Sequence, residues 1–328
     1  MDYPRPELHR NMLQPNLGLN TVRQTKAKSW EHVLVSDAPT PAVYLEIKDG
    51  SSVFPLYLYP DASGERHNQF GLFDGEHDGK AQARRPNLDP ACIADVAARL
   101  KLGFTADGTG DLQQTFGPED IFHYIYAILH SPSYRSRYAE FLKINFPRIP
   151  FTSNLDLFRA LCSRGAALVR MHLLTSAALS HRTVGFPIPA MNGENLIEAG
   201  HPRYVAPGEP DPESGKLVET GRVYISKGNP KTGARGQYFE GILTDIWELQ
   251  VGGYQVCEKW LKDRRGRALN FNDIRHYQKM IGALVWISHI EHSFEYCVLF
   301  DRSAVLLPAQ PGRWERGHRP DGVRVAAA

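Results

Sequence analysis

The sequence predicts an α+β fold in which small mixed β layers pack against a helical body. Residues 117–175 and 254–298 carry apolar side chains at helical spacing. Residues 1–60 and 222–249 carry short β-branched and aromatic runs bounded by turn-forming residues, which is typical of strands. With 328 residues, the chain is long enough for about two domains of roughly 100–200 residues each.

The first 60 residues form a strand-rich segment. Strands are predicted at residues 17–22, 33–35, 43–47 and 53–59. Residues 61–116 are rich in Gly, Asp, Asn and His, and we interpret them as a surface linker with one short helix at residues 90–100.

Three helices are predicted between residues 117 and 175. Pro118, Glu119 and Asp120 form a typical helix start, because proline fits the first turn and acidic side chains favour the positive end of the helix dipole. A second helix begins at Pro132, and a third covers residues 154–174. Helical spacing in the second helix places Tyr134, Tyr138, Phe141 and Leu142 inside, and Arg135, Arg137, Glu140 and Lys143 outside.

Strands and helices both follow in the second half of the chain. Residues 222–226 and 242–249 are predicted strands joined by a long loop at residues 227–236. Residues 254–265 and 272–298 are predicted helices, and we expect them to pack against 117–175, because neither segment buries its apolar stripe alone. The tail, residues 308–328, is predicted to be flexible.

The charge balance excludes a histone-like protein. Lys and Arg number 38 against 36 Asp and Glu, although a local basic face remains compatible with this balance. The four cysteines are widely spaced, which argues against a disulfide framework and a cysteine zinc site. A secretory signal and an apolar run long enough for a membrane helix are absent, so we expect a cytoplasmic protein.

The familiar catalytic signatures are missing. The sequence has no G-x-x-x-x-G-K-[ST], no [NDS]-P-P-[YF] and no G-x-S-x-G motif. Residues 210–216 resemble a nuclease core only superficially, and a solvated turn is the better interpretation because the acids are nearly contiguous. His289 with His292, or His123 with His130, could share a metal, but core or exposed histidines are favoured. We predict no catalytic residue and no metal site.

Two clusters of basic and amide side chains are the candidate DNA-binding residues. Arginine can pair with guanine and amide side chains with adenine, while lysine and arginine at a helix end suit phosphate contacts. Composition alone favours a solvated surface instead, and an alternative reading surface lies in 180–215, with Arg182, Asn192, Asn195 and Arg203. The candidates are Arg222, Lys227, Asn229, Lys231, Arg235 and Gln237 in the first cluster, and Lys262, Arg264, Arg265 and Arg267 in the second.

Two long blocks carry a resemblance to a known family. Residues 117–151 read GPEDIFHYIYAILHSPSYRSRYAEFLKINFPRIPF, and residues 247–267 read WELQVGGYQVCEKWLKDRRGR, followed by DIRHYQ at 273–278. Both blocks resemble signatures of the C-terminal specificity region of type ISP restriction–modification enzymes. The N-terminal block that ends in residues 54–60 also resembles the stretch that joins the methyltransferase of those enzymes to their target recognition domain. The similarity covers about residues 10–300.

The resemblance implies a target recognition domain at residues 117–307, with a fold like that of other such domains. It also implies that residues 1–60 are the end of an adenine-specific methyltransferase domain. The expected partners are double-stranded DNA and a separately encoded methyltransferase or translocase chain, in a phage-defence system. No cofactor is expected, because S-adenosylmethionine, ATP and magnesium belong to family domains that this sequence lacks.

The resemblance therefore implies a sequence-specific DNA recognition module that is non-catalytic by itself and positions a methyltransferase or restriction partner on its site. Two alternatives stay open. The chain could be the C-terminal part of a split adenine-specific DNA methyltransferase that is active only with a partner chain. It could also be a decayed gene fragment.

Overall fold

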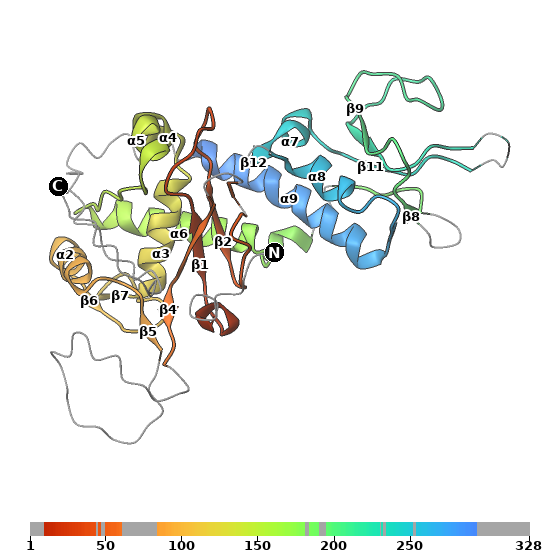
Figure 1. Cartoon of the computed structure of the whole chain (residues 1–328). Coiled ribbons are helices and arrows are strands. Elements are labelled where there is room, and N and C mark those ends of the chain that lie inside the picture. Colours follow the sequence, from red (N-terminus) through yellow and green to blue (C-terminus); the bar gives the residue numbers. More distant parts are fainter. Residues whose placement is uncertain are drawn as a thin grey trace.

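The computed structural model describes residues 10–43, 45–46, 50–60, 84–180, 184–189, 195–229, 231, 234–251 and 254–293. The fold is α+β, with several small sheets and a set of helices, as the sequence predicts. The predicted tail, residues 308–328, lies outside the described residues. Figure 1 shows an elongated molecule in which one long helix runs between two groups of elements.

A three-stranded antiparallel sheet forms from the first predicted strands. Its order is β2-β1-β3, with β1 at Gly18–Thr21, β2 at Val33–Ser36 and β3 at Ser52–Pro55. A 3-10 turn, η1, precedes it at Arg10–Leu13, and β4 (Tyr57–Leu58) pairs with β5 (Arg85–Pro86). The strand predicted at 43–47 is wrong for the described residues of that stretch. The chain turns at Ala42 and Val43, and the Ser51 N–H donates to the Ala42 carbonyl.

Residues 84–116 contribute to the first core. The predicted helix is found as α2, Pro90–Leu100, where the Asp89 side chain caps the first turn. Its buried side chains are Val96 and Leu100. Two short parallel strands follow, β6 (Gly103–Phe104) and β7 (Thr115–Phe116). Residues 61–83 of the predicted linker lie outside the described residues.

The first and third predicted helices form a close pair. They are α3 (Pro118–Leu129) and α6 (Leu155–His172). A methyl group on Gly165 of α6 would lie only 1.8 Å from the carbonyl oxygen of His123 in α3, so the pair meets at a glycine. The Asp120 carboxylate accepts the N–H groups of Gly117 and Gly110 and fixes the start of α3.

The second predicted helix is broken. Tyr138 leaves the helical conformation and separates α4 (Pro132–Arg137) from α5 (Ala139–Ile144). The break changes the phase of the apolar face, so Phe141, predicted inside, has 69% of its surface exposed. Arg135, predicted outside, instead donates through Nε to the Leu129 carbonyl at 2.7 Å. Tyr134 and Leu142 are buried as predicted.

The second core is built around another three-stranded antiparallel sheet. Its order is β11-β10-β9, with β9 at Arg203–Val205, β10 at Arg222–Tyr224 and β11 at Tyr238–Glu240. The strand predicted at 242–249 is wrong, because Gly241 has a positive φ that turns the chain out of β11, and α7 follows at Thr244–Glu248. The smaller elements here are η2 (Ala177–Ser180), β8 (Asn195–Leu196), β12 (Gln250–Val251), β13 (Tyr254–Gln255), α8 (Val256–Lys262) and β14 (Ala268–Leu269).

One helix belongs to both cores. Helix α9, Phe271–Ser293, places Tyr277 and Ile281 in the second core and Ala283 and Ile287 in the first. Its buried positions lie between Tyr277 and Ile287. The predicted packing of 117–175 against 254–298 therefore holds for the later turns of α9, whereas α8 and the first turns of α9 pack in the second core.

Candidate nucleic-acid interface

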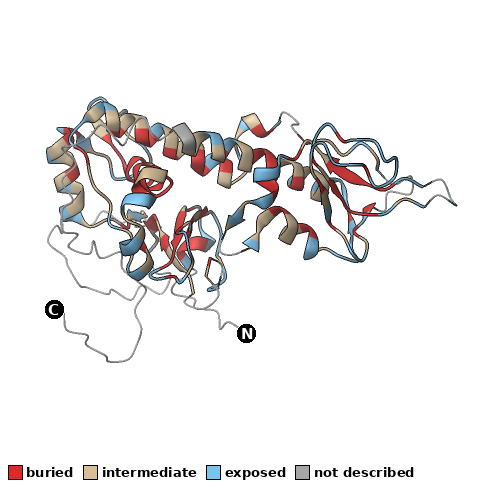
Figure 2. Ribbon diagram, turned by 90° about the horizontal axis from the view of Figure 1, so that it is seen from above, coloured by how far each residue is buried: buried red, intermediate tan, exposed pale blue. Residues whose placement is uncertain are grey.

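The predicted loop at residues 227–236 is the end of a hairpin. Strands β10 and β11 pair antiparallel, and a further bridge between Asn229 and Ala234 continues the ribbon beyond them. We call residues 225–229, 231 and 234–237 the arm. Figures 1 and 2 show that it projects from the end of the second core, away from the helices.

Three cations on the arm lack an acidic partner. Lys227, Lys231 and Arg235 are exposed, and none of them forms an ion pair with another residue in the described part of the chain. Asn229 is also exposed, and its side-chain oxygen accepts the Lys231 N–H at 3.0 Å. The arm therefore presents positive charge that no acidic side chain among the described residues neutralises.

Arg222 and Gln237, at the base of the arm, are occupied by contacts within the protein. The Arg222 guanidinium lies 2.7 Å from the Asp211 carboxylate and 4.5 Å from the centre of the Tyr238 ring. Gln237 is buried and donates to the Ile188 carbonyl and to Asn195. These two side chains hold the base of the arm together.

Asp211 is a buried anion in the turn predicted to be solvated. Its carboxylate accepts hydrogen bonds from Arg222, from the Tyr224 hydroxyl at 2.5 Å and from the N–H groups of Glu213 and Ser214. Burial alone would raise the pKa of Asp211, but these hydrogen bonds outweigh it and hold the pKa far below its usual value. The turn is thus anchored to the sheet by a charged side chain.

Two of the four cations of the second predicted cluster are paired with acidic residues, and the other two contact uncharged groups. The Lys262 ammonium lies 2.7 Å from Glu258, and Arg267 lies 2.7 Å from Asp273. The Arg264 guanidinium stacks 3.7 Å from the centre of the Trp260 ring, and Arg265 donates to the His201 carbonyl. This surface offers less unpaired positive charge than the arm.

The alternative surface at 180–215 is only partly available. Arg182 and Asn192 lie outside the described residues. Asn195 is buried, and its side-chain amide donates to the Leu269 carbonyl. Arg203 is exposed on β9, where it stands opposite Tyr224 of β10. Of the four residues, Arg203 is thus the described one that could add to the charge near the arm.

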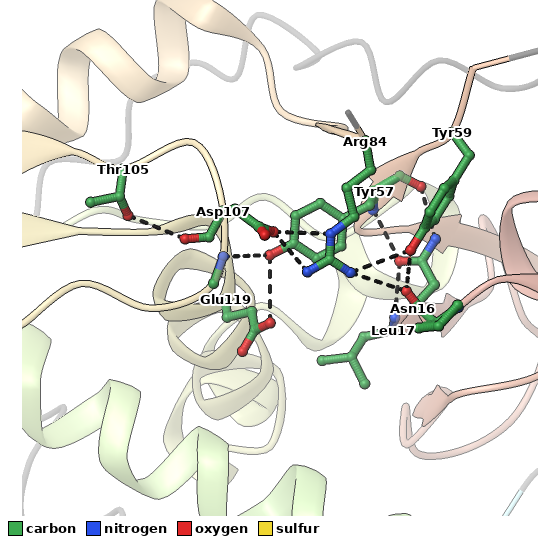
Figure 3. A network of polar contacts seen from close by, with 10 residues as sticks. Asn16, Leu17, Tyr57, Tyr59, Arg84, Thr105, Asp107 and Glu119 are labelled. Carbon is green, nitrogen blue, oxygen red and sulfur yellow. Dashed lines mark hydrogen bonds and ion pairs between the residues drawn. The ribbon is translucent and has the colours of Figure 1, made fainter. Parts of the chain in front are cut away.

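A polar network that sequence reasoning missed joins the first strands to the start of α3 (Figure 3). The Arg84 guanidinium lies 3.8 Å from the centre of the Tyr57 ring and 2.7 Å from Asp107. The Tyr57 hydroxyl accepts the Gly108 N–H and donates toward Glu119. Burial raises the pKa of Tyr57 and also that of Glu119. Because these groups satisfy one another, the network holds two parts of the first core together.

A second buried polar group fastens α9 to the first core. His130 Nδ1 lies 2.7 Å from the Glu291 carboxylate, which also lies 3.4 Å from Arg135. Burial, and to a smaller extent the positive charge of the nearby Arg135, holds the pKa of His130 well below its usual value. The Tyr126 hydroxyl contacts His172 at 3.0 Å. Within the described ranges, no three His, Cys, Asp or Glu side chains are placed to bind a metal ion together.

In the part of the chain that the structure describes, no helix is both long enough and apolar enough to cross a bilayer.

Comparison with known proteins gives a family and a fold. Residues 1–290 match the model of the Type ISP C-terminal specificity domain. The structure is similar to the ATP-dependent Type ISP restriction-modification enzyme LlaBIII bound to DNA, with a TM-score of 0.51 and 16% identity over 86% of this chain. It is also similar to the DrdV–DNA complex, with a TM-score of 0.53 and 18% identity over 90% of this chain. The chain spans 16% and 26% of the lengths of those two proteins. No curated protein sequence matches.

Proposed function

Since the chain belongs to the family of Type ISP C-terminal specificity domains, we propose that it recognises a specific double-stranded DNA sequence through the arm. The observation that carries this proposal is the contrast between the two basic clusters. Lys227, Lys231 and Arg235 lack acidic partners among the described residues, whereas Lys262 and Arg267 are paired. A DNA-binding surface needs cations that are available for phosphates.

The shape of the arm supports the same proposal. It is a two-stranded antiparallel ribbon that projects from its sheet, and the major groove of B-DNA admits such a ribbon. In this arrangement Lys227 and Lys231 contact phosphates, which gives affinity and register. Arg235 and Asn229 are the arm residues able to pair with base edges, guanine and adenine respectively. Arg203 on the neighbouring strand adds a further phosphate contact.

The domain assignment belongs to this proposal. Residues 117–307 form the target recognition domain, residues 1–60 are the end of an adjoining methyltransferase domain, and 61–116 connect them. Recognition positions a methyltransferase or restriction partner on the site. The chain itself supplies no catalytic group, so binding requires neither S-adenosylmethionine nor ATP nor magnesium.

Site selection with the purified full chain tests the proposal. A random duplex pool is incubated with the chain in the absence of cofactors and with EDTA present, and bound duplexes are sequenced after several rounds. We expect one sequence to be enriched by the chain. Enrichment of no sequence, or equal enrichment by a chain with alanine at Lys227, Lys231 and Arg235, contradicts the proposal. Methyl transfer from S-adenosylmethionine by the chain alone contradicts its non-catalytic part.

A further inference from the structure

The connection between β9 and β10 folds back against the base of the arm. Within it, the Gly208 N–H donates to the Val218 carbonyl, and the Val218 N–H donates to the Glu209 carbonyl. A bridge between Pro210 and Leu217 extends this pairing. Residues 206–218, which we call the brace loop, are therefore ordered by their own backbone hydrogen bonds.

Asp211 attaches the brace loop to the sheet. Its carboxylate accepts hydrogen bonds from the side chains of Arg222 and Tyr224, both on β10, and from the N–H of Glu213. The backbone on either side of Asp211 is thereby fixed relative to the sheet from which the arm projects. The main chain of Glu213, the next acidic residue of the loop, is therefore held in a defined position.

Glu213 reaches the arm itself. Its Oε1 atom accepts the Gly236 N–H at 2.5 Å. A methyl group on Gly228, on the other strand of the arm, would lie 2.1 Å from the same oxygen, and one on Gly236 would lie 2.6 Å from it. The carboxylate therefore occupies space that two glycines leave open, one on each strand of the ribbon.

We propose that Glu213 is a positioning residue that fixes the direction of the arm and so determines how well the protein discriminates between DNA sequences. This inference rests on the proposed DNA recognition by the arm. A carboxylate beside a phosphate-binding ribbon weakens attraction to DNA of any sequence. The hydrogen bond from Gly236 restricts the ribbon to one geometry, which base contacts require because they are directional.

These two effects give opposite signs in binding experiments. Removing the charge alone should tighten binding to every duplex. Removing the hydrogen bond should reduce the preference for the selected duplex. Glu213→Gln removes the charge and keeps an oxygen that can accept the Gly236 N–H, whereas Glu213→Ala removes both.

The test measures Kd for the duplex recovered by site selection and for a scrambled duplex of the same composition, using the full chain. We expect Glu213→Ala to lose about tenfold or more in the ratio of the two constants, the size of a lost hydrogen bond to a charged group. Glu213→Gln should keep the ratio within about threefold and bind both duplexes more tightly. Hydrogen exchange at the Gly236 amide should be faster in Glu213→Ala than in Glu213→Gln.

A second variant approaches the same contact from the other side. Gly228→Ala keeps Glu213 but fills the space of its carboxylate and also brings a methyl group 2.9 Å from the Ala234 carbonyl oxygen, so it should lose at least as much discrimination as Glu213→Ala does. Glu213 is exposed, so its replacement should leave the fold intact. If Glu213→Ala and Glu213→Gln have the same ratio of the two Kd values while Lys227, Lys231 and Arg235 prove necessary for binding, the positioning role is wrong. If those three cations prove unnecessary, the recognition proposal itself fails and the inference falls with it.

Discussion

Replacing Lys227, Lys231 and Arg235 with alanine removes the three exposed arm cations that have no acidic partner within the described residues. Each one that neutralises a phosphate releases a condensed counterion when DNA binds. The logarithm of the binding constant therefore falls with the logarithm of salt concentration, by about 0.9 for each contact on B-DNA.

Three such contacts set the size of the effect. If all three residues bind phosphates, the slope for the variant is shallower by about 2.7, and raising salt from about 50 to 200 mM weakens the natural chain roughly 40-fold more than the variant. If Arg235 reads a base instead, the difference in slope is about 1.8, and Arg235→Ala alone costs about 1–3 kcal/mol at one base position.

Fluorescence anisotropy of a labelled duplex, titrated at several salt concentrations, measures this slope. A matched control replaces Arg23, Lys26 and Lys28, three exposed cations on the segment between β1 and β2. The control has the same net charge as the arm variant. An unchanged slope in the arm variant, or an equal change in the control, refutes the assignment of the arm.

Three further predictions concern the stability of the fold. Arg222→Ala should lower the free energy of unfolding by about 3–5 kcal/mol, because it leaves the buried Asp211 without its cation. An unchanged urea midpoint would contradict this. Gly165→Ala should destabilise the chain by about 1–3 kcal/mol, since the methyl group would collide with the His123 carbonyl. A rise in the melting temperature would instead show that helix propensity dominates. Stability should be full above pH about 6.5 and decrease as pH falls, by up to about 1.4 kcal/mol per pH unit from His130, because the unfolded chain takes up a proton that the buried ring does not. Urea unfolding at pH 7 and pH 5 measures this loss. An equal loss in a His130→Asn variant would show that His130 is not its cause.

Local sequence signals predicted the helices well. Helix α2 has the expected bounds because Asp89 and Pro90 mark its start within two residues. The break at Tyr138 has no comparable signal, and it alone turned Phe141 outward. The strand predicted at 242–249 failed because its apolar residues suit a short helix as well as a strand.

The candidate site was harder to predict, because its character depends on partners distant in sequence. Arg222 meets Asp211 eleven residues away, and Gln237 meets Asn195 at a separation of 42. Neither contact could be inferred from composition. One signal was available in the sequence, since Glu258 and Lys262 are four residues apart on a predicted helix and form an ion pair there.

The double membership of α9 restricts how such a protein can be recombined with its relatives. A chimera that exchanges the second core has to carry α9 as far as Ile281, because Tyr277 and Ile281 fill that core. It has to keep the host residues Ala283, Ile287 and Glu291, because they contact the first core. Leu284 and Val285 still pack against the second core, so the two sets overlap and the crossover falls within residues 282–286 of a continuous helix. A junction placed in a surface loop would divide one of the two interiors.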